Sequence, residues 1–142
     1  MLFALLVRGS AELGARGLVL EELQSQALLL IWQLGESDDP DSVLDRAIAT
    51  SRVTLTAPDG TVRYDSQADA AAQENHADRP EIAQALAEGR ASRVRWSDTV
   101  GEHLLYYAQR LPSGDVLRLS GPVRTTDTVF TRMLPWLLLG VA

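Results

Sequence analysis

Residues 52–66 read Arg-Val-Thr-Leu-Thr-Ala-Pro-Asp-Gly-Thr-Val-Arg-Tyr-Asp-Ser, and this stretch decides the fold. Apolar and polar side chains alternate over 52–56 and again over 61–65, which is the period of a half-buried strand. Between the two runs, Pro58-Asp59-Gly60 is a strong tight-turn signal. The stretch therefore predicts an antiparallel hairpin, and with it a domain built on a sheet.

The flanking sequence extends the hairpin into a larger sheet with helices. Further strands are expected at 91–96, 102–111 and 115–123, and short turn-rich connections make them antiparallel. Helices are expected at 10–34, 41–50, 78–89 and 125–142, and residues 67–77 form a polar connection. This order predicts an α+β fold in which a long N-terminal helix packs on a five-stranded, mostly antiparallel sheet.

The start of the third predicted helix carries a capping signal. Asp78 stands three residues before Glu81, and Pro80 lies inside the first turn. An acidic N-cap with a glutamate at the third helical position is typical of a capping box. We therefore expect the Glu81 side chain to turn back toward the helix start.

Residues 10–34 predict one long helix whose apolar side chains recur every seven positions. The predicted seam consists of Leu13, Leu20, Leu23, Ala27 and Leu30. Because heptads are typical of helices that pair, we expect a homodimer through this helix. The alternative is a single amphipathic helix whose apolar side lies on the sheet. The two arrangements can also combine, with the first half of the helix pairing and the second half packing.

Both ends of the chain are apolar. Residues 2–7 and 133–142 are almost free of polar side chains, but neither run reaches the roughly 20 residues that a membrane-spanning helix needs. We interpret residues 1–8 as the end of a first transmembrane helix and 124–142 as a C-terminal helix that enters a second one. Residues 9–123 would then form a domain on one side of a membrane. The alternative is a short core element at each end.

Composition and motifs exclude several function classes. The 142 residues suit one domain, and a net charge of −6 argues against nucleic acid as a partner. Without cysteine there is no thiolate nucleophile and no thiolate metal site. Since no motif for a nucleotide loop, a serine nucleophile or a zinc protease occurs, we expect no catalytic residue, no metal and no cofactor.

Three blocks occur in order along the chain. The first is 52–66; the second is Glu-Asn-His-Ala-Asp-Arg-Pro-Glu-Ile at 74–82 followed by Ala-Leu-Ala-Glu-Gly at 85–89; the third is Arg-Trp-Ser-Asp-Thr-Val-Gly-Glu-His-Leu-Leu-Tyr-Tyr-Ala at 95–108. The first resembles the opening of extracytoplasmic PAS-like sensor domains of the single-Cache or PDC type. The other two are similar to blocks of PhoR-like sensor histidine kinases, although Trp96 stands where that family usually has tyrosine.

The resemblance implies a sensor domain without catalytic activity, placed between two membrane spans of a two-component histidine kinase. The same sensor could instead serve a chemoreceptor or a cyclic-dinucleotide enzyme, and a further alternative is a ligand-free dimerisation or protein-binding module. The predicted ligand-binding residues are Tyr64, His76, Arg79, Arg95 and Tyr107. An arginine beside tyrosine hydroxyls could hold a carboxylate or a phosphate. The alternatives are that Arg95 is a solvated strand residue and that His76 only fixes its loop.

Overall fold

The structure, a computed structural model, describes residues 2–46, 50–98 and 100–123. Within these residues the elements are α1 (Leu2–Gly35), α2 (Pro40–Arg46), β1 (Arg52–Thr56), β2 (Val62–Asp65), a 3-10 turn η1 (Ala70–Ala72), α3 (Pro80–Glu88), β3 (Arg90–Ser97), β4 (Glu102–Arg110) and β5 (Val116–Pro122). The long first helix and the five strands confirm the predicted α+β fold.

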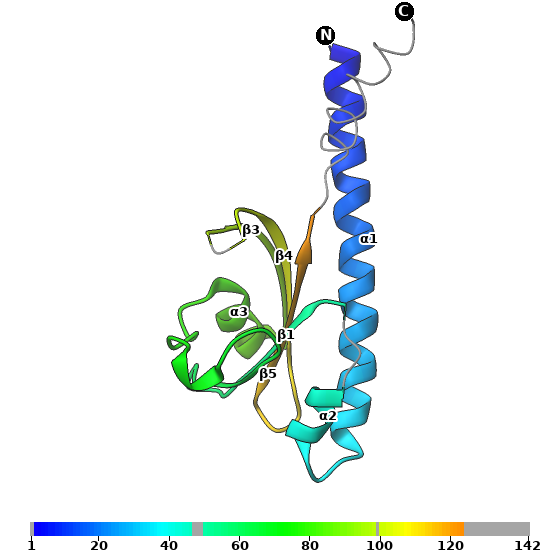
Figure 1. The fold of residues 1–142 in the computed structure, drawn as a ribbon. Coiled ribbons are helices and arrows are strands. Elements are labelled where there is room, and N and C mark those ends of the chain that lie inside the picture. The colour runs from blue at the N-terminus through cyan, green and yellow to red at the C-terminus, as the bar shows by residue number, and fades with distance from the viewer. Residues whose placement is uncertain (1, 47–49, 99, 124–142) are drawn as a thin grey trace, which may run out of the picture.

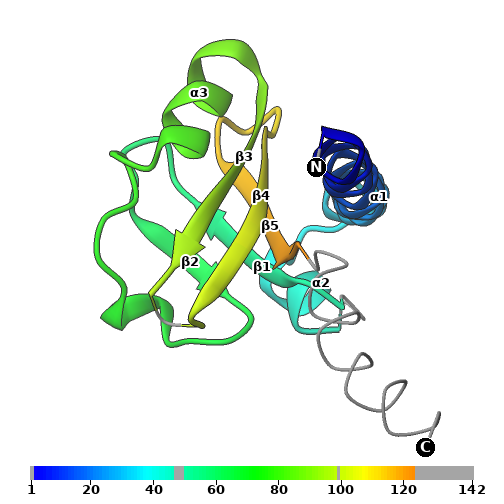
Figure 2. The same cartoon turned by 90° about the horizontal axis from the view of Figure 1, so that it is seen from above.

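The strands form one sheet in the order β2-β1-β5-β4-β3, and every ladder is antiparallel. Helix α1 lies along one face of this sheet and α3 covers the other (Figure 1), as the view from above in Figure 2 also shows. The chain leaves the edge strand β2, passes through α3 and re-enters at the opposite edge, β3. Helix α3 packs mainly on β3 and β4 and also reaches the middle strand β5.

Strand alternation gives the two faces different chemistry. On β5, Leu117 and Leu119 point to α1, whereas Val116 and Arg118 point to the α3 side. The α1 face holds the larger apolar core. Its buried residues are Leu23, Ala27, Leu30, Leu44, Val53, Leu55, Leu105, Tyr107, Leu117 and Leu119. The apolar cluster under α3 is smaller and leaves room on that face for polar side chains.

Helix α1 uses its predicted seam to pack on its own sheet. Leu23, Ala27 and Leu30 are at most 4% exposed, because they lie in the core against the strands. Their assignment to a dimer interface is therefore corrected: intrachain packing occupies them. Leu20 is partly buried against the same core, and Leu13 is 69% exposed. The second half of the helix thus follows the alternative arrangement, in which the apolar side of a single helix lies on the sheet.

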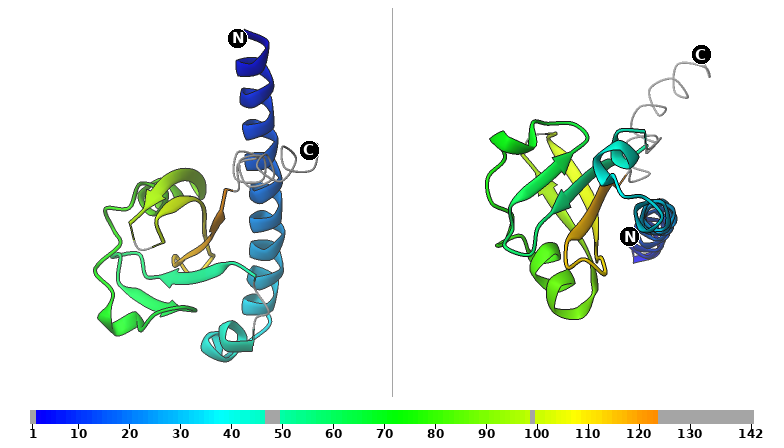
Figure 3. Two further views of the ribbon diagram at one scale, coloured as in Figure 1. Left: turned by 45° about the horizontal axis from the view of Figure 1, so that its top comes forward. Right: turned by 90° about the horizontal axis from the view of Figure 1, so that it is seen from below.

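The first half of α1 extends beyond the sheet (Figures 1 and 3). The helix runs without a break from Leu2 to Gly35, so residues 2–8 and the predicted helix at 10–34 belong to one continuous helix, and Gly14 and Gly17 lie inside it. No helix in the described part of the chain is long and apolar enough to cross a membrane. The predicted helix and membrane entry at 124–142 lie outside the described residues.

Helix α2 begins at Pro40, next to the predicted start at residue 41. The backbone N–H of Ser42 donates to the Asp39 carboxylate at 3.3 Å, which caps the helix. The helix is described only as far as Arg46, and Thr50 lies in a bend, so the expected end at residue 50 is wrong.

The β1–β2 turn is locked to the connection that leads to α3. Gly60 has φ +89°, and a Cβ there would collide with Asn75 and Ala77. The backbone N–H of His76 donates to the Gly60 carbonyl at 2.8 Å, and the Asn75 amide donates to the Asp59 carbonyl at 2.9 Å. Only glycine allows both the left-handed turn and this approach. The first two sequence blocks are therefore joined in space.

The predicted capping box at α3 does not form. The N-cap is Arg79, without a side-chain capping bond, and Asp78 is exposed. Pro80 at the start of the helix has no N–H to satisfy, which lowers the need for a cap. The Glu81 side chain instead turns into the protein, where it is fully buried.

Candidate functional site

The face of the sheet beneath α3 carries an unusual set of buried polar side chains. They are Thr54, Thr56, Asp65, His76, Glu81, Arg118 and Ser120. Acidic and basic residues are almost never fully buried unless they are paired. Several of the buried polar groups on this face satisfy one another through ion pairs and hydrogen bonds.

Glu81 is the central group. Its Oε1 atom accepts hydrogen bonds from Arg118 on β5 at 3.1 Å and from Arg95 on β3 at 3.2 Å. The side chains of Glu81 and Arg118 are 0% and 6% exposed, whereas that of Arg95 is 31% exposed. One carboxylate thus links α3 to two strands, and Arg95 connects the cluster to solvent.

A second acid continues the cluster toward the far edge of the sheet. Arg118 donates to the Thr54 hydroxyl at 3.4 Å, and that hydroxyl donates to Asp65 Oδ2 at 3.2 Å. The Arg52 guanidinium donates hydrogen bonds to both Asp65 carboxylate oxygens, the shortest from Nη2 to Oδ2 at 2.8 Å. A fork of this kind is the strong geometry for an arginine–carboxylate pair.

An aromatic ring completes the arrangement. The guanidinium carbons of Arg95 and Arg118 lie 4.3 and 5.4 Å from the centre of the Tyr106 ring. A desolvated cation over an aromatic face is attracted by the ring quadrupole. We call the seven connected residues the polar network: Arg52, Thr54, Asp65, Glu81, Arg95, Tyr106 and Arg118.

Several buried polar atoms in and beside the polar network have no hydrogen-bond partner among the described residues. They are Thr56 Oγ1, His76 Nδ1, Arg79 Nε, Glu81 Oε2 and Arg95 Nε. An unsatisfied buried donor or acceptor costs about 1–3 kcal/mol, so native proteins rarely leave several together. These atoms present both donors and acceptors to a polar guest.

The charges of the polar network do not cancel. Arg52, Arg95 and Arg118 carry three positive charges against two carboxylates, Asp65 and Glu81. Burial opposes ionisation of Asp65, but hydrogen bonds from Arg52 and from the Gln67 N–H hold its pKa below the ordinary value. The network is therefore net positive, which favours an anionic guest.

His76 is neutral at physiological pH. Burial, followed by the charges of Arg118 and Arg79, lowers the pKa of His76 from 6.5 to about 4. The ring is 4% exposed. A neutral imidazole offers one donor and one acceptor, so His76 adds hydrogen-bonding capacity without charge.

The structure brings together three of the five predicted ligand-binding residues. His76 and Arg79 are neighbours, since the Arg79 N–H donates to the His76 carbonyl at 3.0 Å, and Arg95 reaches the polar network through Glu81. Tyr64 and Tyr107 are not part of this group. Both pack with the core on the α1 face, where burial raises the pKa of each phenol. Placing them beside Arg95 was wrong, because residues 95 and 107 lie on opposite faces.

Sequence reasoning missed the two most buried members of the polar network. The sequence pattern predicts a capping role for Glu81, and it assigns no role to Arg118 in the strand expected at 115–123. One signal was available: Arg118 stands between Leu117 and Leu119 in a strand whose other residues are uncharged. A single charge in such a strand needs a partner on the covered face.

The described residues contain no group of three or more His, Cys, Asp or Glu side chains arranged to hold a metal ion. The polar network and the neighbouring His76 instead offer guanidinium groups, a hydroxyl and a neutral imidazole. Groups of this kind are suited to hold a small polar molecule by hydrogen bonds and charge.

Comparison with solved structures supports the fold. The Bacillus subtilis YkuI protein, which has an EAL domain and was solved in complex with its substrate c-di-GMP and calcium, superposes with a TM-score of 0.55. The sequences are 13% identical, and the match covers 72% of this chain but 31% of the YkuI chain, so it shows shared fold alone. No curated protein matches the chain.

A family comparison covers the part of the chain that holds most of the polar network. The family described as Single Cache-like matches residues 44–116, which is more than half of the 142 residues. The match begins in α2 and includes the β1–β2 turn at Gly60, α3 and strands β1 to β4. The chain belongs to the Single Cache-like family, whose members are sensor modules.

Proposed function

We propose that this chain is the extracytoplasmic signal-sensing domain of a membrane-bound two-component histidine kinase. The observation that carries the proposal is the polar network with its unpartnered buried atoms. A purely structural core gains little from such groups, because buried ion pairs are weak stabilisers. A sensor can use them, because a ligand that satisfies them binds one arrangement of α3 and the sheet better than another.

The signal would leave through α1. This helix packs on the sheet face opposite the polar network, and strands β1, β4 and β5 contribute residues to both faces. A ligand that moves β5 through Arg118 therefore also moves the surface on which α1 lies. Small helix shifts of this kind are a known way to pass a conformational change between domains.

A second candidate output is a cyclic-dinucleotide enzyme, because the YkuI protein combines a similar fold with an EAL domain. A chemoreceptor and a ligand-free dimerisation or protein-binding module are the remaining alternatives. The coding sequence downstream of residue 142 in the parent gene discriminates the outputs. A phospho-acceptor helix followed by an ATP-binding domain supports the kinase, and an EAL-type domain refutes it.

The ligand class follows from the charge of the site. Net positive charge and free guanidinium N–H groups favour a small carboxylate, since arginine binds carboxylates with two parallel hydrogen bonds. We propose acetate, succinate and glutamate as probes, measured by thermal denaturation of the 142-residue chain. A ligand at a hundred times its Kd stabilises the folded state by about 2.7 kcal/mol.

A matched pair of variants tests where the probe binds. Arg95→Met removes a guanidinium of the polar network, whereas Arg93→Met removes one on the same strand that donates to half-buried Gln84 at 3.2 Å. We expect carboxylate stabilisation to disappear in Arg95→Met and to persist in Arg93→Met. Equal responses of the two variants, or no response of the wild type to any probe, would argue for the ligand-free module.

We also propose that the chain forms a homodimer through the side of α1 that faces away from the sheet. Leu18, Leu29 and Trp32 are 71%, 57% and 65% exposed. Leu29 and Trp32 lie within one helical turn of each other, Leu18 lies about three turns before Leu29, and all three are on the opposite side from Leu23 and Ala27. A second copy of α1 would cover this apolar stripe, which a monomer leaves in water.

A further inference from the structure

A cavity lies on the opposite face of the sheet from the polar network. It has a volume of about 500 Å³ and opens between the end of α1, the start of α2 and the turn that joins β4 to β5. Its apolar walls include Ile31, Leu34, Leu55 and Leu111. Cavities that bind small molecules usually measure roughly 300–1,000 Å³. This one is therefore large enough to hold a ligand, and it shares no residue with the polar network.

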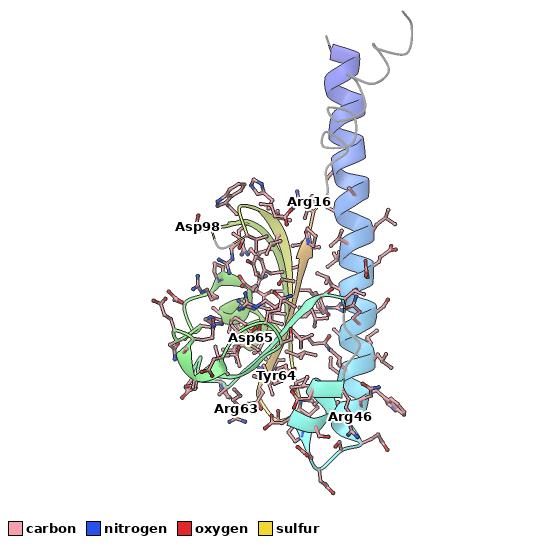
Figure 4. All side chains as sticks on the ribbon, in the orientation of Figure 1. Arg16, Arg46, Arg63, Tyr64, Asp65 and Asp98 are labelled. Atoms are coloured by element: carbon pink, nitrogen blue, oxygen red, sulfur yellow. The ribbon has the colours of Figure 1, made fainter. Side chains whose placement is uncertain are left out.

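The polar groups of the cavity lie at its rim. Arg63 donates to Asp115 at 2.9 Å, and both residues line the cavity. Leu55 and Thr56 pair with Tyr64 and Val62, which leaves Arg63 as the extra residue of a β-bulge. The bulge takes Arg63 out of the strand alternation, and Figure 4 shows its side chain at the lower edge of the molecule.

One carboxylate at the rim remains free. Asp41 lines the cavity, and no ion pair within the described ranges ends on it. The lining therefore holds one arginine, already paired, and two aspartates. The segment from Glu36 to Asp41 adds further carboxylates beside the opening, at Glu36, Asp38 and Asp39. The field at the mouth is negative, which attracts cations and repels anions.

We propose that this cavity binds a small amphiphilic amine. The apolar body would lie against Ile31, Leu34 and Leu55, and the ammonium group would pair with Asp41 at the rim. An anionic head would have only Arg63, whose charge Asp115 already neutralises, and it would face the unpaired Asp41 carboxylate. The site is a second sensing site beyond the proposed function, and it does not depend on what binds the polar network.

Matched probes test the head group. 1-Octylamine, 1-octanol and octanoate share an apolar chain and differ in charge, and their binding to the 142-residue chain at pH 7 is measured by isothermal titration calorimetry. We expect octylamine to bind best and octanoate worst. Asp41→Asn should weaken octylamine by about threefold, as expected for a partly exposed ion pair, and leave octanol unchanged. Tightest binding by octanoate, or octylamine binding that is insensitive to Asp41→Asn, overturns the proposal.

A blocking variant tests the location. Gly35 lines the cavity, lacks a positive φ and has no atom within 4 Å of an added Cβ, so Gly35→Phe can fill the space without backbone strain. Gly17→Phe is the control, since Gly17 is equally open and lies on the part of α1 beyond the cavity. We expect Gly35→Phe to lose octylamine affinity by about tenfold or more and Gly17→Phe to keep it.

A third measurement needs no variant. In the wild type, octylamine should shift the backbone amide resonances of Gly35, Ser37 and Ser113, which line the cavity, and leave those of Glu81 and Arg95 in place. Shifts centred on the polar network, equal affinity of the two glycine variants, or absence of binding by all three probes refutes the amine site. None of these outcomes bears on the carboxylate test, which uses Arg95→Met.

Discussion

Glu81 on α3 and Arg118 on β5 form an ion pair of 3.1 Å in which both side chains are buried. The pair joins helix α3 to the middle strand of the sheet, 37 residues away along the chain. Burial lowers the pKa of Arg118, which the Glu81 charge opposes. The buried charge of Arg118 is therefore compensated by Glu81.

Removing one partner of this pair should be more harmful than removing both. Glu81→Leu leaves Arg118 buried without its main partner, and we expect a loss of about 3–5 kcal/mol in the free energy of unfolding. Adding Arg118→Met should restore a large part of that loss, because the uncompensated charge is gone. Urea denaturation measures both variants. Glu88→Leu, at an exposed site on α3, is the control and should change stability little.

The single variant Arg118→Met completes the comparison. If the loss of stability in the double variant equals the sum of the losses in Glu81→Leu and Arg118→Met, the two residues do not act as a pair. Coupling of this kind is what a double-mutant cycle measures.

Stability should fall as the solution is acidified below pH 6.5, because of His76. Its folded pKa is about 4 against an ordinary 6.5, so the unfolded chain gains a proton in this window and the folded chain does not. Between pH 7 and pH 5 we expect a loss of about 2 kcal/mol from this residue. His76→Gln should remove that part of the pH dependence.

Chemical denaturation at pH 7, 6 and 5 tests this prediction. His103, which is exposed, provides the control: His103→Gln should keep the wild-type slope. A His76→Gln variant that loses stability with the same slope as the wild type would mean that the buried imidazole accepts its proton in the folded state.

Substitutions at two glycines separate the cost of a left-handed backbone from the cost of a steric clash. Gly60 and Gly89 have φ values of +89° and +95°, but only at Gly60 would a Cβ meet neighbouring atoms. Gly89→Ala should therefore cost about 1 kcal/mol, from the left-handed conformation alone. Gly60→Ala should cost clearly more, because Asn75 and Ala77 must also move. Equal melting temperatures for the two variants would contradict the close contact between the turn at Gly60 and the connection at Asn75 and Ala77.

The proposed dimer predicts different behaviour for two exposed tryptophans. Trp32 on α1 and Trp96 on β3 are 65% and 51% exposed. Trp32→Gln should weaken self-association in sedimentation equilibrium, whereas Trp96→Gln should leave it unchanged. Combining Leu18→Gln with Trp32→Gln should give a monomer over the concentration range where the wild type is dimeric. A dimer that persists in the double variant excludes the outer side of α1 as its interface.

The elements of the fold were predictable because each carries a local signal. The turn at Gly60, the alternation around Val53 and Val62 and the apolar repeat of α1 all act over a few residues. The heptad repeat predicts an apolar side of the helix. It does not predict what covers that side, because an apolar residue such as Leu23 packs equally well on a sheet or on a second helix.

The site was harder to predict because it depends on register. Alternation places Arg93 and Arg95 on one side of their strand, and the structure agrees, since both donate to side chains of α3. Alternation within β4 does not say whether Tyr106 or Tyr107 joins them. That choice needs the pairing of Arg93 with Tyr106, which is set by the whole sheet.

The overhang of α1 has a mechanical consequence. Among the helix residues whose side chains the structure describes, those that pack on the core begin at Val19, and the helix from Leu2 to Leu18 is roughly 25 Å long. We expect this stretch to act as a lever arm. A tilt of about 5° at the sheet would displace the far tip by roughly 2 Å, which is the amplitude of many signalling helix movements. Rearrangements too small to disturb the core would thus be magnified at a distance.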